Sequence, residues 1–298
     1  MGNGVIDGFV SRLPPAAFDE DWNHATPLPA SPAQVEAVHS RLGSPPIDLI
    51  FASHSHFDHT WDTATWAART GARVIGTRTT VLQCRAQGIP ESQCTIISGG
   101  EVLPLTGELT CYVARGNHAG DDEHGAALRA PRALTKIPRL DPETAGLRPG
   151  VHDDFPNGGG SMTYLFVWRN DGQILSWAHT SSISAFDLDR PVIVDGQDLG
   201  RPDENLRVAM AQAGLDRVDL WLAPRGPRAH AAVRPLLNPA AVVLHHWDSI
   251  WDSPWQQGTI VDPAPYAPVH GGDVPVLVPR FCGSLTLTRS GLDPGSGG

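Results

Sequence analysis

The stretch IDLIFASHSHFDH, residues 47–59, joins an apolar run to three imidazoles and a carboxylate. Its first seven residues are mostly aliphatic and aromatic, which predicts a buried strand. The loop that leaves this strand then carries four side chains of the kinds that bind metals: His54, His56, Asp58 and His59. Imidazole nitrogens and carboxylate oxygens are typical ligands of zinc and related cations. The pattern therefore predicts a metal centre at a strand end, and three unrelated loop histidines are a much weaker interpretation.

The overall charge argues against a polyanionic partner. The 298 residues include 22 Lys and Arg against 32 Asp and Glu, and the formal net charge is −10. Such a surface is poorly suited to the phosphates of nucleic acid or to an anionic membrane. We therefore expect a small-molecule substrate and no nucleic-acid or membrane partner. Nothing in the pattern indicates an oligomeric state.

The N-terminal residues MGNGVIDG contain no basic segment and no long apolar segment. No other stretch of the chain approaches membrane-spanning length, so we expect a cytoplasmic protein. The four cysteines are widely spread without a CxxC spacing, which favours reduced thiols over a disulfide framework. They are Cys84, Cys94, Cys111 and Cys282.

Strand-like and helix-like segments alternate along the chain, which predicts an α/β fold. We expect one domain over residues 1–290 and a flexible tail over residues 291–298. Strands are expected at residues 5–10, 47–53, 73–76, 107–118, 162–168, 173–178, 218–224 and 240–244. Helices are expected at residues 32–42, where Ser31 is the N-cap, and at residues 60–69, 79–87 and 203–213.

A segment rich in Gly, Pro and charged residues, 119–160, fits neither a helix nor a strand. Loops of this length inside a domain are usually functional lids or solvated insertions. The segment begins directly after His118, so a lid-like insertion that faces the substrate is one interpretation. A solvated excursion is an equally good one.

Two later strand ends carry further histidines. Residues 107–118 end at His118, and residues 240–244 are followed by His245 and His246. Neighbouring side chains of a strand point to opposite faces, so we expect one of the latter two to bind metal. The remaining histidines are expected on the surface or in loops: His24, His39, His124, His152, His230 and His270.

The ligand types suggest the chemistry. Imidazoles and carboxylates without a thiolate favour one or two zinc ions, with iron or manganese as alternatives. Zinc held by three histidines lowers the pKa of a bound water to about 7 and so provides hydroxide at neutral pH. We therefore expect hydrolysis of a small ester, lactone or phosphoester. Asp58 is the expected catalytic residue, either as a ligand of a second metal or as a general base.

Several residues resemble the metallo-β-lactamase superfamily. They are the HSHFDH motif, the lone His118, the pair GGGSMTYLFV (158–167) and QILSWAHT (173–180), and VVLHHWD (242–248). The resemblance spans roughly residues 5–251 and implies a four-layered αβ/βα sandwich with metals at one edge between the two sheets. It implies a first metal held by His54, His56 and His118. It implies a second metal held by Asp58, His59 and His246, which favours His246 over His245.

Two departures from the family pattern stand out. The family normally has an aspartate that bridges the two metals, where this chain has His179. A neutral imidazole offers one lone pair and cannot bridge two cations, so we expect one tightly bound metal and a weaker second one. His179 is either a metal ligand or an imidazole that faces the ligands or the substrate. The family also usually has one or two strands before the equivalent of residues 5–10, so we expect either a short first sheet or a sequence that is truncated relative to its relatives.

Two other functions stay open: a metal-binding oxidoreductase or dioxygenase on the same scaffold, which iron would favour, and a catalytically silent binding relative. Two carboxylates, Asp62 and Asp248, are candidates for orienting the ligand imidazoles. Tryptophans beside the ligand segments are candidates for the wall of an apolar substrate pocket. These are Trp61, Trp247, Trp251 and Trp255.

Overall fold

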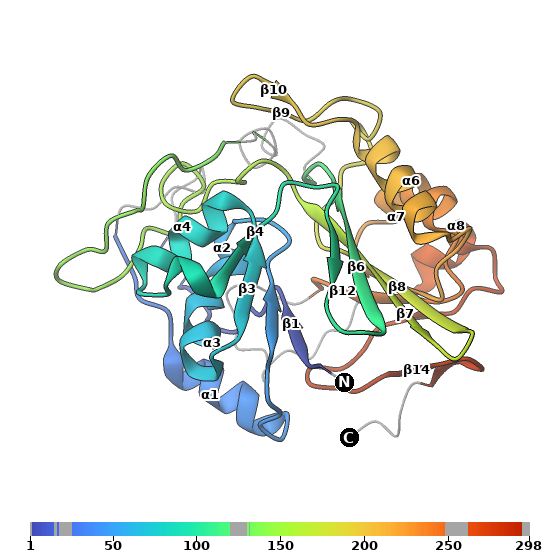
Figure 1. The fold of residues 1–298 in the computed structure, drawn as a ribbon, viewed down its shortest axis with the longest axis horizontal. Helices are drawn as coiled ribbons and strands as arrows, with labels where there is room; N and C mark the ends of the chain where they lie inside the picture. Colours follow the sequence, from blue (N-terminus) through green and yellow to red (C-terminus); the bar gives the residue numbers. More distant parts are fainter. Residues whose placement is uncertain are drawn as a thin grey trace.

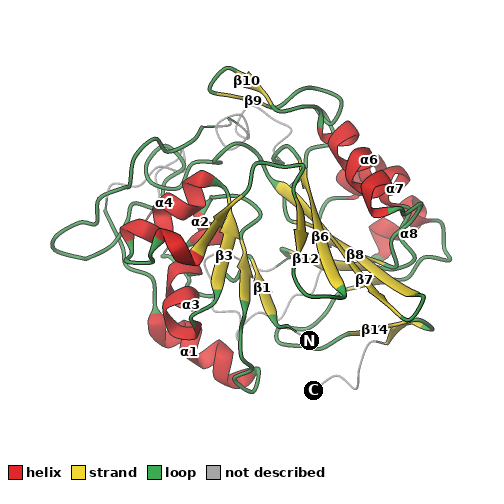
Figure 2. Cartoon of the chain, viewed as in Figure 1, coloured by secondary structure: helices red, strands yellow, loops and turns green. Residues whose placement is uncertain are grey.

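Two β-sheets face each other at the centre of the molecule, and helices cover the outer face of each sheet (Figures 1 and 2). The computed structural model describes residues 2–14, 17, 26–119, 130, 132–247 and 262–293. The first sheet contains the N-terminal strands, and the second contains most of the strands from residue 102 onward.

The first sheet is parallel and has the strand order β1-β2-β3-β4. Its strands are β1 (Gly4–Ile6), β2 (Leu49–Phe51), β3 (Arg73–Gly76) and β4 (Cys94–Ile96). Parallel strands need crossover connections, and here these contain α1 (Pro32–Arg41), α3 (Thr63–Thr70) and α4 (Arg78–Ala86). Ser31 caps α1 by accepting a hydrogen bond from the backbone N–H of Gln34. Aliphatic and aromatic side chains are buried between these helices and the sheet, among them Val35, Ile50, Trp66 and Val74.

The second sheet has seven strands in the order β13-β12-β11-β8-β7-β6-β5. An antiparallel meander is formed by β5 (Val102–Pro104), β6 (Leu109–Arg115), β7 (Met162–Asn170) and β8 (Gln173–Thr180). Parallel pairing continues through β11 (Leu220–Pro224), β12 (Val242–His245) and β13 (Val276–Leu277). The outer face is covered by α6 (Pro202–Ala213), α7 (Pro227–Leu237) and α8 (Ala267–His270).

The inner faces of the sheets are held together by an aromatic and aliphatic core. Phe51 of the first sheet packs against Tyr164 and Phe166 of the second, with ring centroids 5.1 and 5.3 Å apart. Together with the two helix–sheet clusters, this inter-sheet cluster gives three packed interfaces and therefore four layers. The expected four-layered αβ/βα architecture is confirmed.

Several short elements complete the described chain. They are α2 (Phe57–Thr60), η2 (Glu91–Gln93), β9 (Ile193–Val194), β10 (Gln197–Asp198), η4 (Ala264–Tyr266), β14 (Thr286–Thr288) and β15 (Gly291–Asp293). The expected flexible tail is wrong for residues 291–293, because they form β15 and pair with β14. Leu287 and Leu292 of this hairpin pack against the cluster of Leu220, Ala241 and Val243 in the second sheet, and this packing explains the order.

The observed strands and helices differ from the expected ones where the local backbone or tertiary contacts determine their ends. The strand expected at residues 5–10 ends at Ile6, because Asp7 has a left-handed φ of 49°. The helix expected at residues 60–69 is α3, which begins at Thr63, while Thr60 ends the separate turn α2. In the described part of the chain, β1 has a strand neighbour on one side only, namely β2.

The segment over residues 119–160, expected to be either a lid or a solvated excursion, is partly packed into the fold. Residues 120–129 and 131 lie outside the described residues, but Leu147, Val151 and Phe155 are buried. The carbonyl of Pro156 accepts a hydrogen bond from Ser55 Oγ in the loop between the metal-motif histidines. The later half of the segment therefore supports the histidine loop from one side.

We expect Phe155→Ala to destabilise the fold by about 3–5 kcal/mol, because the side chain is fully buried against Trp61. Urea unfolding would measure the change. As a control, Leu140→Ala removes an exposed side chain of the same segment and should cost less than about 0.5 kcal/mol. Equal effects of the two variants would mean that the segment contributes no packing.

His230 and His270 are buried, contrary to the expected surface or loop positions, because α7 and α8 close over the second sheet. His230 Nε2 lies 2.7 Å from the carbonyl of Pro224 and therefore donates to it. The Nδ1 atom of His230 must then accept from His270 Nε2, 2.9 Å away. This pairing needs only one proton on each ring and is therefore compatible with two neutral imidazoles.

We expect this pair to make the fold less stable at low pH. Burial, followed by the charges of His230 and Arg234, lowers the pKa of His270 to about 4, below the value of 6.5 in an unfolded chain. The unfolded state therefore binds more protons between these values, so stability present above pH 6.5 is lost as the pH falls toward 4. Urea unfolding at several pH values should show a shallower loss for His270→Gln. An unchanged slope in that variant would contradict the assignment.

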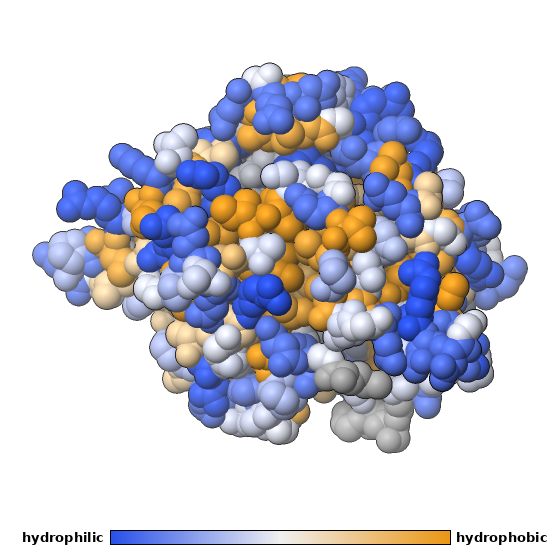
Figure 3. Space-filling view, in the orientation of Figure 1, coloured by the Kyte–Doolittle hydropathy of each residue, from blue (hydrophilic) through white to orange (hydrophobic). Residues whose placement is uncertain are grey.

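Apolar surface extends across the middle of the face shown in Figure 3. Exposed large apolar side chains among the described residues include Ile96 on β4 and Val102 on β5. No helix in the described ranges combines the length and the apolar character needed to span a membrane.

Candidate metal centre

The metal-motif side chains meet at one edge of the two sheets. His54 and His56 follow β2, and His118 lies three residues after β6. Asp58 and His59 belong to α2, the helical turn that begins directly after His56. His246 follows β12 and has a left-handed φ of 55°. Segments far apart in the sequence thus bring six ligand-type side chains to one place.

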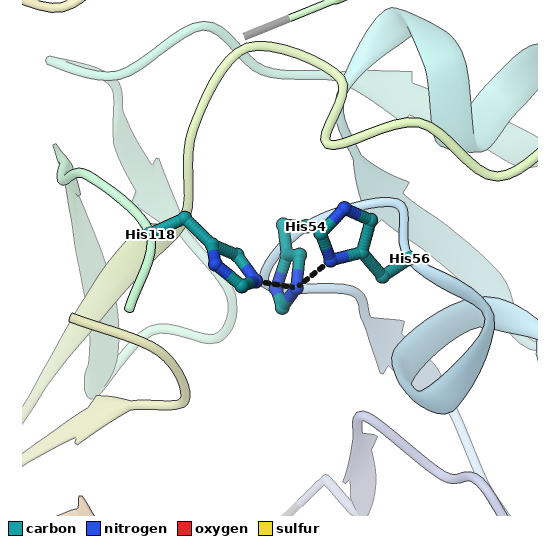
Figure 4. A group of neighbouring side chains, drawn as sticks. All are labelled: His54, His56 and His118. Carbon is teal, nitrogen blue, oxygen red and sulfur yellow. Dashed lines mark hydrogen bonds between the residues drawn. The ribbon is translucent and has the colours of Figure 1, made fainter. Parts of the chain in front are cut away.

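The first set of ligand atoms belongs to His54, His56 and His118. Figure 4 shows their rings facing one another. His54 Nε2 lies 3.1 Å from His118 Nε2 and 3.2 Å from His56 Nδ1. A tetrahedral zinc with Zn–N bonds of about 2.0–2.1 Å separates its ligand nitrogens by roughly 3.3 Å. The spacing of the first set therefore fits a single ion.

Hydrogen bonds on the far sides of the rings fix which nitrogens carry lone pairs. His118 Nδ1 lies 2.6 Å from the carbonyl of Ala119 and must donate to it. Ser53 Oγ donates to the carboxylate of Asp7, so at 3.1 Å it accepts from His54 Nδ1. The Nε2 atoms of His54 and His118 are then both unprotonated and face each other at 3.1 Å. Two such lone pairs repel unless a cation lies between them.

The protonation of the first set agrees with metal ligation. Burial, followed by the charges of neighbouring imidazoles, holds the pKa of His54 and His56 well below 6.5. Burial also lowers the pKa of His118 to about 4. All three rings are thus neutral at pH 7, and neutral imidazole is the form that binds metal.

The second set of ligand atoms belongs to Asp58, His59 and His246. Asp58 Oδ2 lies 3.2 Å from His246 Nε2 and 3.3 Å from His59 Nε2. The two imidazole nitrogens are themselves 3.3 Å apart. Three ligand atoms at nearly equal separations again fit one cation. Asp58 and His246 keep 18% and 31% of their side-chain surface exposed, so this set is the more accessible to solvent.

Asp7 links the two sets and was not recognised from the sequence. Its carboxylate accepts hydrogen bonds from the backbone N–H of Ser53 at 2.7 Å and from Ser53 Oγ at 2.6 Å. It also lies 3.0 Å from His59 Nδ1. Burial alone would raise the pKa of Asp7, but His59 and Ser53 outweigh burial and lower it to about 2. A carboxylate behind a ligand imidazole fixes its tautomer and its orientation.

His59 lies between two carboxylates, which makes this position suited to positive charge. Burial would lower the pKa of His59, but Asp58 and Asp7 reverse this effect and raise it to about 10. His59 Nδ1 lies 3.0 Å from the carboxylate of Asp7, and Nε2 lies 3.3 Å from the carboxylate of Asp58, so each ring nitrogen faces a negative charge. A proton or a metal ion satisfies the same electrostatic demand there.

His179 and His245 join neither set. Their rings stack on each other with centroids 4.6 Å apart and planes within 10°. His245 Nε2 donates to the carbonyl of Thr180 at 2.9 Å. The structure therefore brings His246, and not His245, to the second set. His179 is buried, and its Nδ1 has no hydrogen-bond partner among the described residues.

The expected supporting roles are partly wrong. Asp62 does not orient an imidazole: it accepts hydrogen bonds from Ser11 and from the backbone N–H of Val10, and so holds the loop after β1. Trp61 is buried against Phe155 in a packed cluster and cannot form the wall of an open pocket. Three of the other candidates lie outside the described residues: Asp248, Trp251 and Trp255.

A family model described as the metallo-beta-lactamase superfamily matches residues 27–83. The match contains α1, β2 and the complete HSHFDH motif. The resemblance to the metallo-β-lactamase superfamily is confirmed. The order of the layers and the position of both ligand sets at the sheet edge agree with this resemblance.

Curated relatives match part of the chain. A UPF0173 metal-dependent hydrolase of Pyrobaculum calidifontis is 31% identical over 102 residues, which are 34% of this chain and 42% of the relative. Its counterpart in Pyrobaculum islandicum is 31% identical over 72 residues, 24% of this chain and 32% of the relative. The matches thus span less than half the length of these relatives.

Solved structures show more distant likenesses. A metallo hydrolase of the archaeon Ignicoccus hospitalis has a TM-score of 0.46 at 16% identity and covers 78% of this chain and 76% of its own. The isothiocyanate hydrolase from Delia radicum gut bacteria has a TM-score of 0.47 at 13% identity, with coverages of 93% and 89%. At TM-scores below 0.5, neither likeness bears on the activity of this chain.

Proposed function

We propose that this protein is a metal-dependent hydrolase of a small ester, lactone or phosphoester. The observation that carries the proposal is the convergence of unprotonated nitrogens in the first set, where His54 Nε2 and His118 Nε2 lie 3.1 Å apart. The partial matches to curated metal-dependent hydrolases support the same activity. The negative net charge favours a small-molecule substrate over nucleic acid.

Zinc is the metal that we propose, because the ligand sets contain imidazoles and one carboxylate without a thiolate. The first set would hold one ion, and the second set would hold another. Bound zinc would supply hydroxide at neutral pH and polarise the oxygen of the bond under attack. The ligand types also accommodate iron or manganese.

The chain's own residues prepare the site for this chemistry. Ser53 and the carbonyl of Ala119 hold the Nδ1 protons of His54 and His118, so that both Nε2 lone pairs face inward. Asp58 is only partly buried and presents Oδ2 between His59 and His246. If the second set carries no metal, Asp58 is the carboxylate placed to accept a proton from an attacking water.

Metal analysis combined with a substrate panel tests the proposed function. The purified chain should contain zinc and should hydrolyse at least one member of a panel of simple esters, lactones and phosphoesters. Chelation should abolish the turnover, and added zinc should restore it. Stoichiometric iron without hydrolysis would favour an oxidoreductase instead, and bound zinc without any turnover would favour a silent binding protein.

A further inference from the structure

A pocket of about 410 Å³ opens beside the second ligand set. The pocket lies between the loop after β1 and the ends of β11 and β12. Its volume is within the range of roughly 300–1,000 Å³ that is usual for small-molecule sites. Asp58, His59 and His246 form part of its lining, so a molecule in the pocket would lie against the candidate metal centre.

The other walls of the pocket are mostly apolar. The apolar lining is formed by Ile6, Phe9, Leu222, Val243 and Pro279, and two charged residues, Asp7 and Arg12, also line the pocket. Apolar walls with a few polar groups gathered at one end are the usual composition of a site for a small organic ligand. The apolar part of a ligand would therefore contact these five apolar side chains.

Two imidazoles that join neither ligand set also line this pocket, namely His179 and His245. His245 uses its Nε2–H on the carbonyl of Thr180. His179 is 6% exposed, and its Nδ1 has no partner among the described residues. A buried polar atom without a hydrogen bond costs free energy, so a ligand that supplies the bond would bind more tightly.

We propose that this pocket receives an apolar group of the substrate, about as large as a short alkyl chain, and that His179 hydrogen-bonds to the substrate instead of binding a metal. The proposal rests on the proposed function, since it assumes a hydrolysed bond beside the second ligand set. It names the substrate class more narrowly: compounds whose reactive group carries a compact hydrophobic substituent.

Alkyl hydroxamates test the pocket, because they share one metal-chelating head and differ only in the length of the tail. Acetohydroxamate, butanohydroxamate and hexanohydroxamate would be titrated calorimetrically into the zinc-loaded full chain. Each methylene that enters the pocket should lower the Kd about fourfold. Binding of the short probe measures the metal centre, and the dependence on tail length measures the pocket.

Variants at Leu222 test whether the alkyl tail of the hydroxamate occupies the pocket, because Leu222 is part of its lining. Leu222→Phe narrows the pocket and should remove most of the gain in affinity from acetohydroxamate to hexanohydroxamate. Leu222→Ala widens the pocket, should favour longer tails, and keeps the test available if the larger side chain prevents folding. The matched control is Ile174→Phe, on an exposed position of β8 that does not line the pocket. This control should retain the dependence on tail length.

Three outcomes distinguish a failure of the pocket proposal from a failure of the proposed metal centre. The proposed role of the pocket is supported if the affinity rises with tail length in the unmodified chain and no longer does so in Leu222→Phe. Equal affinity for all three hydroxamates overturns the pocket and leaves the metal centre standing. No binding of any hydroxamate, together with no zinc in the purified chain, overturns the metal centre and with it both proposals.

His179→Phe tests the role of the unpartnered imidazole, because phenylalanine keeps a ring at this position and has no atom that can make a hydrogen bond. Elemental analysis should find the same metal content as in the unmodified chain, while the Kd for hexanohydroxamate rises about fivefold through loss of one hydrogen bond. The loss of one metal equivalent would make His179 a ligand and overturn its assignment to the substrate. An unchanged Kd with unchanged metal content would overturn the proposed hydrogen bond.

Discussion

Replacing His56 by alanine should remove the first metal and the hydrolytic activity together. His56 is the cleanest ligand to test, because its Nε2 makes no hydrogen bond with the described residues and its Nδ1 faces the first set. A metal that polarises the reacting bond contributes several kcal/mol to the transition state, so the loss of the ion should lower kcat/KM by about 10³-fold. Elemental analysis and kinetics on the same preparations would measure both effects.

His152→Ala provides the matched control, since His152 is an exposed histidine outside both ligand sets. This variant should keep the metal content and the activity of the unmodified chain. Stoichiometric metal in His56→Ala would contradict the ligand assignment. Loss of activity with the metal retained would instead place His56 in contact with the substrate.

Much of the fold could be predicted because local signals and tertiary structure agree. The strand expected at residues 73–76 is β3 with the same bounds, and the helix expected from residue 32 begins there because Ser31 caps it and Pro32 suits the first turn. Helix α7 was not predicted. It contains Pro235, a residue that normally argues against a helix interior.

The candidate site could be predicted where its residues follow one another in the chain, and less well where they do not. The spacing of HSHFDH points directly to ligation, and His246 required the family resemblance because the alternation of side chains leaves His245 equally eligible. The burial of Phe155 could not be foreseen, because its segment is rich in Gly, Pro and charge. Only the packing against Trp61 reveals it as structural.

Asp7 shows most clearly what the sequence lacks. Asp7 lies in the motif VIDG, within the strand that was expected over residues 5–10. A carboxylate in the middle of an expected strand gave no sign of a role in the metal centre. The parallel register of β1 with β2 pairs Ile6 with Phe51, so the residues that follow each strand come together. The left-handed backbone of Asp7 then turns its carboxylate toward Ser53 and His59. This contact could be predicted only if the relative positions of the loops after β1 and β2 were known.

Asp7→Asn should weaken metal binding by about 10–100-fold, the usual effect of removing a carboxylate behind a ligand imidazole. The amide keeps the size of the side chain but removes the negative charge next to His59 Nδ1. It also replaces one of the oxygens that accept from Ser53, and so loosens the hydrogen bond that fixes the tautomer of His54. Competition titrations against a chromogenic zinc chelator would measure the affinity of the variant.

Asp48→Asn is the matched control, because Asp48 is an exposed carboxylate just before β2 that accepts a hydrogen bond from the backbone N–H of Asn3. Its zinc affinity should equal that of the unmodified chain. Asp7→Glu should recover less than the full affinity, because the longer side chain cannot serve Ser53 and His59 from the same position. If Asp7→Asn bound zinc as tightly as Asp48→Asn, the tautomers of His54 and His59 would have to be fixed by the metal itself, and the carboxylate would serve only the packing of the two loops.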